Sequence, residues 1–232
     1  MTAVSEDILN FLRRTDTCTV SNAIETFDVR MRNEGYIQGA ARSMFPAMPP
    51  VAGYAITGRI RASAPPMSGR SYYQNPEWWE HIAATPGPKI IALADMDTAP
   101  GAGALFGEIH ARIAISLGCV GYLTNGAIRD LNALEALGFQ CFAGSVSVSH
   151  AYAHLIEFGE PIEIGGMKIN PGDLLHGDCN GVQRIPLRIA NELPAATAKI
   201  LAHEAELFRL CEQPDFSIEK LSAALRREPP KG

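Results

Sequence analysis

Apolar and polar residues repeat with helical spacing near the N-terminus and then with strand-like spacing. The segments SEDILNFLRR (5–14) and TVSNAIETF (19–27) predict two helices, the first with Ser5 as its N-cap. In GYAITGRIRASA (53–64) apolar and polar residues alternate, which predicts a strand with one face exposed to water. EWWEHIAA (77–84) predicts a helix with Asn75 as its cap and a proline at its first position.

From Lys89 onward, strands and helices alternate. KIIALAD (89–95) and CVGYL (119–123) are almost wholly apolar, as strands buried on both faces of a parallel sheet are. The segment between them, residues 104–118, predicts a helix whose buried stripe is formed by Phe106, Ile109, Ile113 and Leu117. The next predicted helix is DLNALEALG (130–138). Strand, helix, strand and helix in this order indicate a right-handed parallel unit.

The remainder of the chain completes the prediction. Short strand candidates with turn residues between them follow Gly138, and two helices are expected between residues 191 and 227. We therefore expect an α/β fold with a mixed sheet and with helical N- and C-terminal segments. Residues 1–232 are expected to form a single domain with its core at about residues 53–186.

Composition argues against nucleic acids and membranes as partners. The net charge is −5 and the isoelectric point is near 5.7, so the chain has no basic field for nucleic acid. No apolar run approaches the ~20 residues that a membrane helix needs. The five cysteines are odd in number and far apart, and no apolar leader segment precedes them. These features predict reduced thiols and a cytoplasmic location.

Glycines cluster in GAGALFGE (101–108), where a predicted helix begins. Their spacing is G-x-G-x-x-x-G, which differs from the dinucleotide-binding fingerprint, and no Gly-Lys-Ser/Thr follows as in a phosphate-binding P-loop. A glycine-rich turn at a helix N-terminus can instead bind a small anion, such as a carboxylate, through backbone N–H groups. Glycines needed only for turning explain the cluster equally well.

Three charged residues are predicted to meet at one edge of the sheet. Glu108 lies in the first turn of one predicted helix, and Arg129 and Asp130 hold the corresponding place after the following strand. If the two strands are neighbours, these side chains can bind a metal ion, hold a 2-oxo acid and transfer a proton. In the structural alternative, Asp130 caps its helix, Glu108 complements the helix dipole and Arg129 pairs with one of them.

Other candidates are weaker. His150 and His154 in HAYAH have the spacing of metal ligands on a helix, but no third ligand is evident. The carboxylates of Asp95 and Asp97 can serve a metal site or a loop equally well. Asp178 and Asn180 precede Gly181 as turn residues do, which favours a structural role. None of the five lysines lies where a Schiff-base lysine would, so carbonyl chemistry here would need a metal ion to withdraw electrons.

Two segments resemble a known family. FGEIHARIAISLGCVGYLTNGAIRDLNALEALGFQCFA (106–143) and INPGDLLHGDCNGVQRIP (169–186) resemble the RraA-like superfamily, which includes 4-hydroxy-4-methyl-2-oxoglutarate aldolases and oxaloacetate decarboxylases. Family enzymes carry an acidic residue, twenty intervening residues and then Arg-Asp, a pattern met by Glu108, Arg129 and Asp130. The resemblance implies a swivelling β/β/α-type core and a lyase that releases pyruvate with the help of a divalent metal ion.

The resemblance also implies roles for individual residues. Backbone N–H groups of Gly107, Glu108, Ile109 and His110 would hold the carboxylate of a pyruvate-type substrate. Arg129 would bind the 2-oxo acid and stabilise its enolate oxygen. Asp130 would anchor Mg²⁺ or Mn²⁺, partly through water, and Glu108 would orient that water or relay a proton. Such a site can cleave a 4-hydroxy-2-oxo acid or decarboxylate oxaloacetate, because both reactions give the pyruvate enolate.

Family members are typically homotrimers, or homohexamers built from trimers, and an acidic residue from a neighbouring subunit completes their site. The resemblance makes Glu204 the candidate for that acid. Two features depart from the family: many family aldolases have Asp where Glu108 stands, and the segment 65–88 looks like a subgroup feature that bears on substrate choice. A regulatory protein of the ribonuclease-inhibitor type is the alternative. A methyltransferase has less support, because no glycine pattern for S-adenosylmethionine is present.

Overall fold

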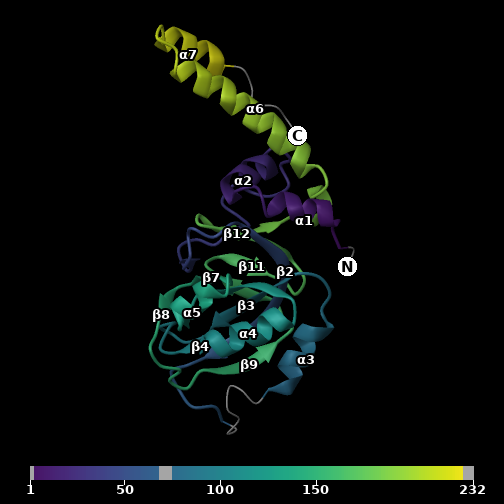
Figure 1. The fold of residues 1–232 in the computed structure, drawn as a ribbon, viewed down its shortest axis with the longest axis vertical. Coiled ribbons are helices and arrows are strands. Elements are labelled where there is room, and N and C mark those ends of the chain that lie inside the picture. The colour runs from purple at the N-terminus through teal and green to yellow at the C-terminus, as the bar shows by residue number, and fades with distance from the viewer. Residues whose placement is uncertain (1–2, 68–74, 227–232) are drawn as a thin grey trace.

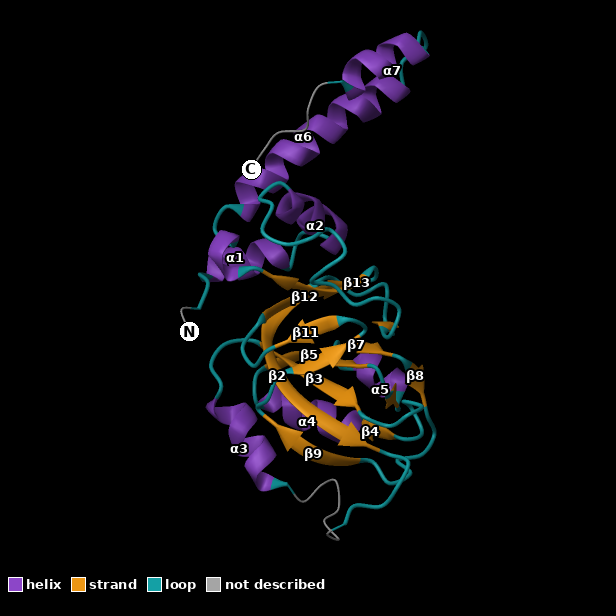
Figure 2. Cartoon of the chain, turned by 180° about the vertical axis from the view of Figure 1, so that it is seen from behind, coloured by secondary structure: helices purple, strands orange, loops and turns teal. Residues whose placement is uncertain are grey.

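A helical arm projects from a body that is built around a mixed β-sheet (Figures 1 and 2). The computed structural model describes residues 3–67 and 75–226. The α-helices of this part are α1 (Glu6–Leu12), α2 (Thr17–Glu25), α3 (Pro76–Ala84), α4 (Glu108–Ser116), α5 (Leu131–Ala136), α6 (Leu193–Cys211) and α7 (Ile218–Leu225). No helix among these residues is long and apolar enough to cross a membrane.

The main sheet has eight strands, seven of them in the order β1-β7-β5-β3-β2-β12-β13, with β9 also paired to β2. Pairs β2–β3, β3–β5 and β5–β7 are parallel, and the others are antiparallel. The strands are β1 (Arg42–Ser43), β2 (Val51–Arg61), β3 (Lys89–Asp95), β5 (Cys119–Thr124), β7 (Gln140–Ala143), β9 (His154–Phe158), β12 (Leu174–Asp178) and β13 (Gly181–Ile185). The mixed α/β fold is confirmed, and so is the adjacency of β3 and β5 on which the expected site depends.

The long strand β2 differs from its prediction. Its residues are buried on both faces from Ala52 to Gly58, whereas one face was expected to meet water. Apolar and polar residues do alternate along β2. However, β2 lies in the middle of the sheet between β3 and β12, and β9 pairs with its C-terminal half, so the polar positions are covered as well. Arg59 is only half-buried there, and its guanidinium pairs with Glu157 of β9 at the surface.

A second, smaller sheet lies beside the main one and holds the candidate site. Its strands β4 (Ala104–Phe106), β6 (Ala127–Ile128) and β8 (Ser145–Val146) are parallel and pair in that order. The helix predicted from residue 104 therefore begins only at Glu108, because residues 104–106 are a strand. Its buried residues are His110, Ala111 and Ala114, while the side chain of Ile109 is 53% exposed, so the predicted apolar stripe is wrong.

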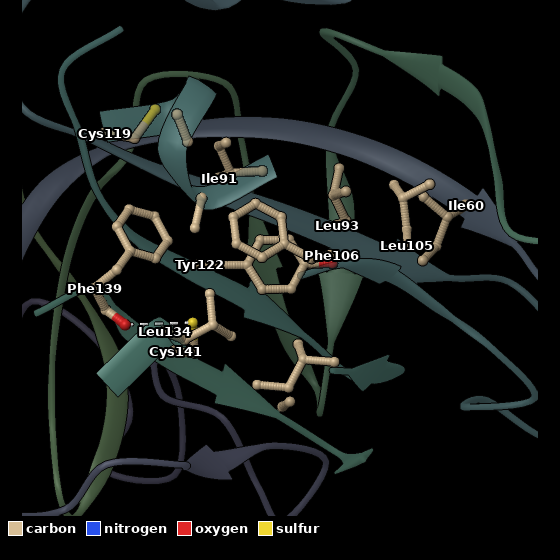
Figure 3. Packing of buried hydrophobic residues seen from close by; sticks show 14 of the residues in the cluster. Ile60, Ile91, Leu93, Leu105, Phe106, Cys119, Tyr122, Leu134, Phe139 and Cys141 are labelled. Atoms are coloured by element: carbon tan, nitrogen blue, oxygen red, sulfur yellow. Dashed lines mark hydrogen bonds between the residues drawn. The ribbon is translucent and has the colours of Figure 1, made fainter. Parts of the chain in front are cut away.

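Two hydrophobic clusters cover opposite faces of the main sheet. One lies under α3, α4 and α5, and in it the rings of Phe106 and Tyr122 stack with centroids 4.0 Å apart (Figure 3). Trp78 of α3 is buried in this cluster, and α3 has Asn75 at its N-cap position, as predicted, although the Asn75 side chain makes no capping hydrogen bond. The other cluster includes the hairpin β10 (Ile162–Ile164) and β11 (Met167–Ile169), which the Gly-Gly turn of the sequence indicated.

The N- and C-terminal helices form a third cluster. Helices α1 and α2 pack with the first turns of α6 against β2 and β12. Only Leu193, Ala196, Thr197 and Ile200 of α6 are buried, and α7 has no buried residue. Beyond Ile200 the apolar side chains of Leu201, Phe208, Ile218 and Leu225 are exposed. The outer half of α6 together with α7 forms an arm (Figure 1), and these exposed apolar side chains lie on it.

Candidate active site

The two segments of the expected site meet because β4 and β6 are parallel neighbours. Phe106 pairs with Ile128, and the N–H of Arg129 donates to the carbonyl of Phe106 at 3.1 Å. Glu108 follows β4 after a single glycine, and Arg129 follows β6 directly. Since both strands run in the same direction, their carboxyl ends place Glu108 and the Arg129–Asp130 pair at one edge.

The Asp130 carboxylate joins these segments. Its Oδ2 accepts a hydrogen bond from the Glu108 N–H at 3.1 Å, and its Oδ1 accepts one from the Arg129 Nε at 3.2 Å. Burial tends to raise the pKa of Asp130, but the Glu108 N–H, Arg129 and the charge of His150 together hold this pKa below its ordinary value. Asp130 is therefore an anion at neutral pH, and each of its oxygens retains lone pairs for a further ligand.

The predicted capping role of Asp130 requires correction. Asp130 occupies the N-cap position of α5, but its backbone is left-handed, with φ of 59°, and its side chain makes no capping bond to that helix. It binds the first N–H of α4 instead, so its charge lies at the positive end of the neighbouring helix. A left-handed backbone at a non-glycine residue is uncommon, and such positions concentrate at functional sites.

Gly107 permits this arrangement. A Cβ atom at this position would lie 2.5 Å from Asp130 Oδ2 and 2.8 Å from Arg129 Cγ, closer than real contacts allow. Gly107 is therefore needed for the close approach of Glu108 to the Arg129–Asp130 pair. Its role goes beyond the chain turn that the sequence suggested as an alternative. The first backbone bond of α4 joins the Ala111 N–H to the Gly107 carbonyl, so the N–H groups of residues 108–110 point out of the helix N-terminus.

The Glu108 carboxylate points along its own helix. Its Oε1 accepts hydrogen bonds from Arg112 Nε at 2.9 Å and from Arg112 Nη2 at 2.7 Å. The structure thus brings the backbone of Glu108 to Asp130 but pairs its carboxylate with Arg112, at the surface. The Glu-x-x-x-Arg spacing in the sequence is typical of such an ion pair and is the local signal for Arg112 as a neighbour of the site.

The remaining candidates have different places. Asp97 accepts three hydrogen bonds, from the N–H groups of Ala62 and Ser63 and from the Ser63 hydroxyl, and Asp95 accepts from the Asp97 and Gly101 N–H groups. Hydrogen bonds to loop backbone and to Ser63 thus occupy these two carboxylates, which favours the loop role over the metal site that the sequence left open.

Asp178 and Glu204 lie away from the edge formed by β4 and β6. Asp178 binds the backbone and hydroxyl of Thr17 in a buried turn, which is the structural role expected for it. Glu204 is half-buried on α6, beyond the last residue of that helix buried against the body. It is thus positioned on the arm.

The two histidines of HAYAH are separated by the fold. His154 begins β9, and its Nδ1 contacts the Tyr152 carbonyl at 2.7 Å. His150 lies before β9, and its Nδ1 contacts the Ala104 carbonyl of β4 at 2.6 Å. Because this segment is not helical, the pair does not form the metal-ligand spacing considered from the sequence, and only His150 lies at the candidate site.

His110 forms part of the wall behind the site. Its ring lies 5.8 Å from that of Phe106 and 5.6 Å from that of Trp79, centroid to centroid. Burial, with a smaller contribution from the charge of His150, lowers the pKa of His110 to about 4, so this imidazole is neutral at pH 7. The segment 65–88 thereby reaches the site through Trp79 of α3. Residues 68–74 of that segment are outside the described part of the chain.

The side chains near the site limit which metal ion can bind. Among residues 3–67 and 75–226, no group of three or more His, Cys, Asp and Glu side chains could enclose a metal. A closed zinc site therefore does not fit these residues. The exposed Asp130 carboxylate, with one hydrogen bond to each oxygen, does fit Mg²⁺, which keeps several waters and binds through one or two carboxylates together with substrate oxygens.

The fold and site define an α/β protein with a charged Arg-Asp pair at a helix N-terminus, and comparison with known proteins identifies its family. The RraA-like family model, described as Aldolase/RraA, matches residues 17–183. The chain therefore belongs to the RraA-like family.

Individual relatives agree with this assignment. The chain is 36% identical over 104 residues to a protein of Halalkalibacterium halodurans named "Putative 4-hydroxy-4-methyl-2-oxoglutarate aldolase". This match covers 44% of the chain and 48% of the relative, so the chain spans about half the length of the curated relative.

Solved structures share the fold at low identity. An uncharacterized protein from Pseudomonas syringae pv. tomato is similar with a TM-score of 0.75 at 19% identity, over 98% of this chain and 96% of that one. RraAS2 of Streptomyces coelicolor, described as an unusual member of the RNase ES inhibitor RraA protein family, gives a TM-score of 0.69 at 19% identity. That match covers 89% of this chain and all of the other.

Proposed function

We propose that the protein is a divalent-metal-dependent, class II pyruvate lyase that cleaves 4-hydroxy-2-oxo acids such as 4-hydroxy-4-methyl-2-oxoglutarate, decarboxylates oxaloacetate, or does both. The observation that carries the proposal is the Asp130 carboxylate, bound at once to Arg129 and to the N-terminus of α4. It combines an anion for a metal, a guanidinium for a 2-oxo acid and a helix end for a carboxylate within a few ångströms. The name of the Halalkalibacterium relative supports the same reaction class.

The substrate carboxylate would bind at the N-terminus of α4, formed by Gly107, Glu108, Ile109 and His110, where helix N–H groups and the dipole favour an anion. The Glu108 N–H donates to Asp130, so the N–H groups that follow it in the first turn would bind the substrate. Arg129 would donate to the 2-oxo group. Its Nε already donates to Asp130, which fixes the plane of the guanidinium and directs the terminal amino groups. As the bond breaks, charge grows on the oxygen that these amino groups contact, so they stabilise the enolate more than the substrate.

Asp130 would hold Mg²⁺ or Mn²⁺, partly through water, and Glu108 would orient a water or relay a proton. When bound, the metal ion supplies a Lewis acid that withdraws electrons from the 2-oxo group. Glu108 lies at the surface beside Arg112, so movement of its side chain toward the site requires that this pair open. Exposed pairs of this type contribute only about 0.3–0.5 kcal/mol, which makes such a movement inexpensive.

An assay for pyruvate tests this function. With Mg²⁺, the purified protein should release pyruvate from oxaloacetate faster than the buffer with Mg²⁺ alone, and EDTA should abolish the difference. Asp130→Asn should lower kcat/KM about 100-fold or more, because it removes the charge that holds the metal. Asp215→Asn, an exposed carboxylate at the turn before α7, is the matched control and should leave the rate unchanged.

The alternative from another class is a regulatory protein that binds a ribonuclease. The name given to the Streptomyces structure concerns that protein, and its 19% identity to this chain supports the shared fold alone. A ribonuclease pulldown separates the two functions. Retention of ribonuclease, together with no pyruvate release and no thermal shift with Mg²⁺ and oxalate, would favour the regulatory function.

A further inference from the structure

The segment that carries His150 is fixed against the small sheet that forms the site. The Ser147 N–H donates to the Ile128 carbonyl at 3.0 Å, and the Ala104 N–H donates to the Ser149 carbonyl at 2.9 Å. A Cβ at Gly103 would lie 2.3 Å from the His150 carbonyl oxygen, so the backbones of β4 and of this segment are in direct contact. His150 is therefore held by the same strands that position Glu108 and Arg129.

The hydrogen bond of the His150 ring determines its tautomer. Nδ1 lies 2.6 Å from the Ala104 carbonyl oxygen, which can only accept, so Nδ1 carries the proton. In the neutral ring the lone pair is then on Nε2. The hydrogen bond of one ring nitrogen to a backbone carbonyl fixes both the tautomer and the orientation of the ring.

The charge of His150 acts on two groups of the candidate site. Desolvation is the largest influence on Asp130 and on His110, and the charge of His150 acts on both: it contributes to the lowered pKa of Asp130 and of His110. His150 thus lies within electrostatic range of the candidate metal ligand and of the first turn of α4. The residue after His150, Ala151, has φ of 45°, a left-handed conformation that is uncommon for a non-glycine residue.

We propose that His150 is a catalytic residue that transfers the proton of the lyase reaction through its Nε2. This inference rests on the proposed function and assigns the proton transfer, for which Glu108 is the other candidate, to His150. In the cleavage, Nε2 takes the proton from the C4 hydroxyl, the C3–C4 electron pair becomes the enolate of pyruvate, and C4 becomes a carbonyl carbon. The imidazolium then gives that proton to C3, so atoms and charge balance without a co-reactant.

Exchange of the methyl protons of pyruvate isolates this step. The protein loaded with Mg²⁺ is incubated with pyruvate in D₂O, and loss of the C3 proton signal is followed by NMR. His150→Asn is the main variant, because its amide nitrogen can replace Nδ1 as donor to the Ala104 carbonyl while Nε2 is lost. We expect exchange to slow about 100-fold, within the usual range for a general acid–base group, with the Kd for oxalate changed less than threefold.

His154→Asn is the matched control, because the same kind of ring contact to a backbone carbonyl is present there. It should exchange at the wild-type rate. His150→Ala with added imidazole distinguishes a catalytic from a structural role. If His150 is catalytic, imidazole should restore part of the exchange in this variant and should not accelerate exchange by the wild type. This variant also serves if His150→Asn does not fold.

The outcomes separate the two proposals. Exchange by His150→Asn within threefold of the wild type overturns the role of His150 and leaves the lyase intact. Loss of oxalate binding in that variant, or absence of imidazole rescue in His150→Ala, also overturns it, in favour of a structural role. If the wild type neither exchanges pyruvate protons nor releases pyruvate from oxaloacetate, the lyase itself is wrong.

Discussion

The Asp130 carboxylate accepts the first backbone N–H of α4, that of Glu108, at 3.1 Å, although Asp130 itself stands at the start of α5. One side chain therefore fixes the N-terminus of a neighbouring helix and carries the charge proposed to hold the metal. Because the hydrogen bond needs only an oxygen atom whereas the proposed metal ion needs the negative charge, the two roles can be separated by substitution.

Asp130→Ala and Asp130→Asn should differ in stability but not in activity. Asn keeps an oxygen to accept the Glu108 N–H and tolerates a left-handed backbone, whereas Ala does neither. We expect Asp130→Ala to lower the free energy of unfolding by about 1 kcal/mol more than Asp130→Asn, the usual value of a helix cap. Urea denaturation measures this difference. Equal stability of the two variants would show that the hydrogen bond to Glu108 contributes little to the fold.

Glu108 and Arg112 should make unequal contributions to catalysis. If Glu108 acts in the reaction, Glu108→Gln should lower kcat at least tenfold, while Arg112→Gln should change it less than threefold because it only releases Glu108. Both should alter stability by no more than about 0.5 kcal/mol, since the pair is exposed. The double variant completes the cycle. Equal effects of the two single variants would instead assign Glu108 to the surface ion pair.

The free energy of unfolding should decrease as pH falls from 6.5 toward 4, because of His110. Its pKa in the fold is about 4, below the ordinary value of 6.5, so the unfolded chain binds a proton between these values and the fold does not. The stabilising contribution is complete above pH 6.5 and is lost as pH falls toward 4. Its size is roughly 3 kcal/mol at most. Comparing the pH dependence of unfolding for the wild type and His110→Gln measures this loss, and identical slopes would contradict it.

Glu204 lies on the arm, so a catalytic role for its carboxylate requires that it reach the site of a neighbouring subunit. We propose a homotrimer, or a homohexamer built from trimers, in which the arm of α6 and α7 covers its exposed apolar residues against another copy. Glu204→Gln and Asp130→Asn should then each be inactive alone, but mixed oligomers of the two should regain activity, since some sites would contain Asp130 from one subunit and Glu204 from another. Coexpressed, doubly tagged oligomers provide the measurement. No recovery in mixed oligomers would place Glu204 outside the site.

The sequence predicts those parts of the fold whose signals are local. The strands β3 and β5 were recognisable as apolar runs, and α3 as a helix from its Asn-Pro start. The strands β4, β6 and β8 were not, because two or three residues are too short to show a period and their pairing is long-range. For that reason the helix α4 was expected four residues too early, and its buried face was assigned to the wrong residues.

The sequence predicts that Glu108, Arg129 and Asp130 meet at one edge of the sheet, and that they form the site stays a prediction. The structure brings the three residues together through the parallel strands β4 and β6, and not through β3 and β5, from which the meeting was expected. The hydrogen-bond partners within the site could not be predicted. Asp130 binds the backbone N–H of Glu108, and the Glu108 carboxylate binds Arg112. The contact of His150 with Ala104 joins segments 46 residues apart, and no local pattern indicates it.

Cleavage of 4-hydroxy-4-methyl-2-oxoglutarate tests the central claim most directly, because this substrate splits into two molecules of pyruvate. Pyruvate and remaining substrate are measured together in the presence of Mg²⁺, with and without EDTA. The proposed lyase should form two pyruvates per substrate consumed and none when EDTA is present. Consumption without pyruvate, or no reaction with this substrate or oxaloacetate at any Mg²⁺ or Mn²⁺ concentration, would contradict the assignment.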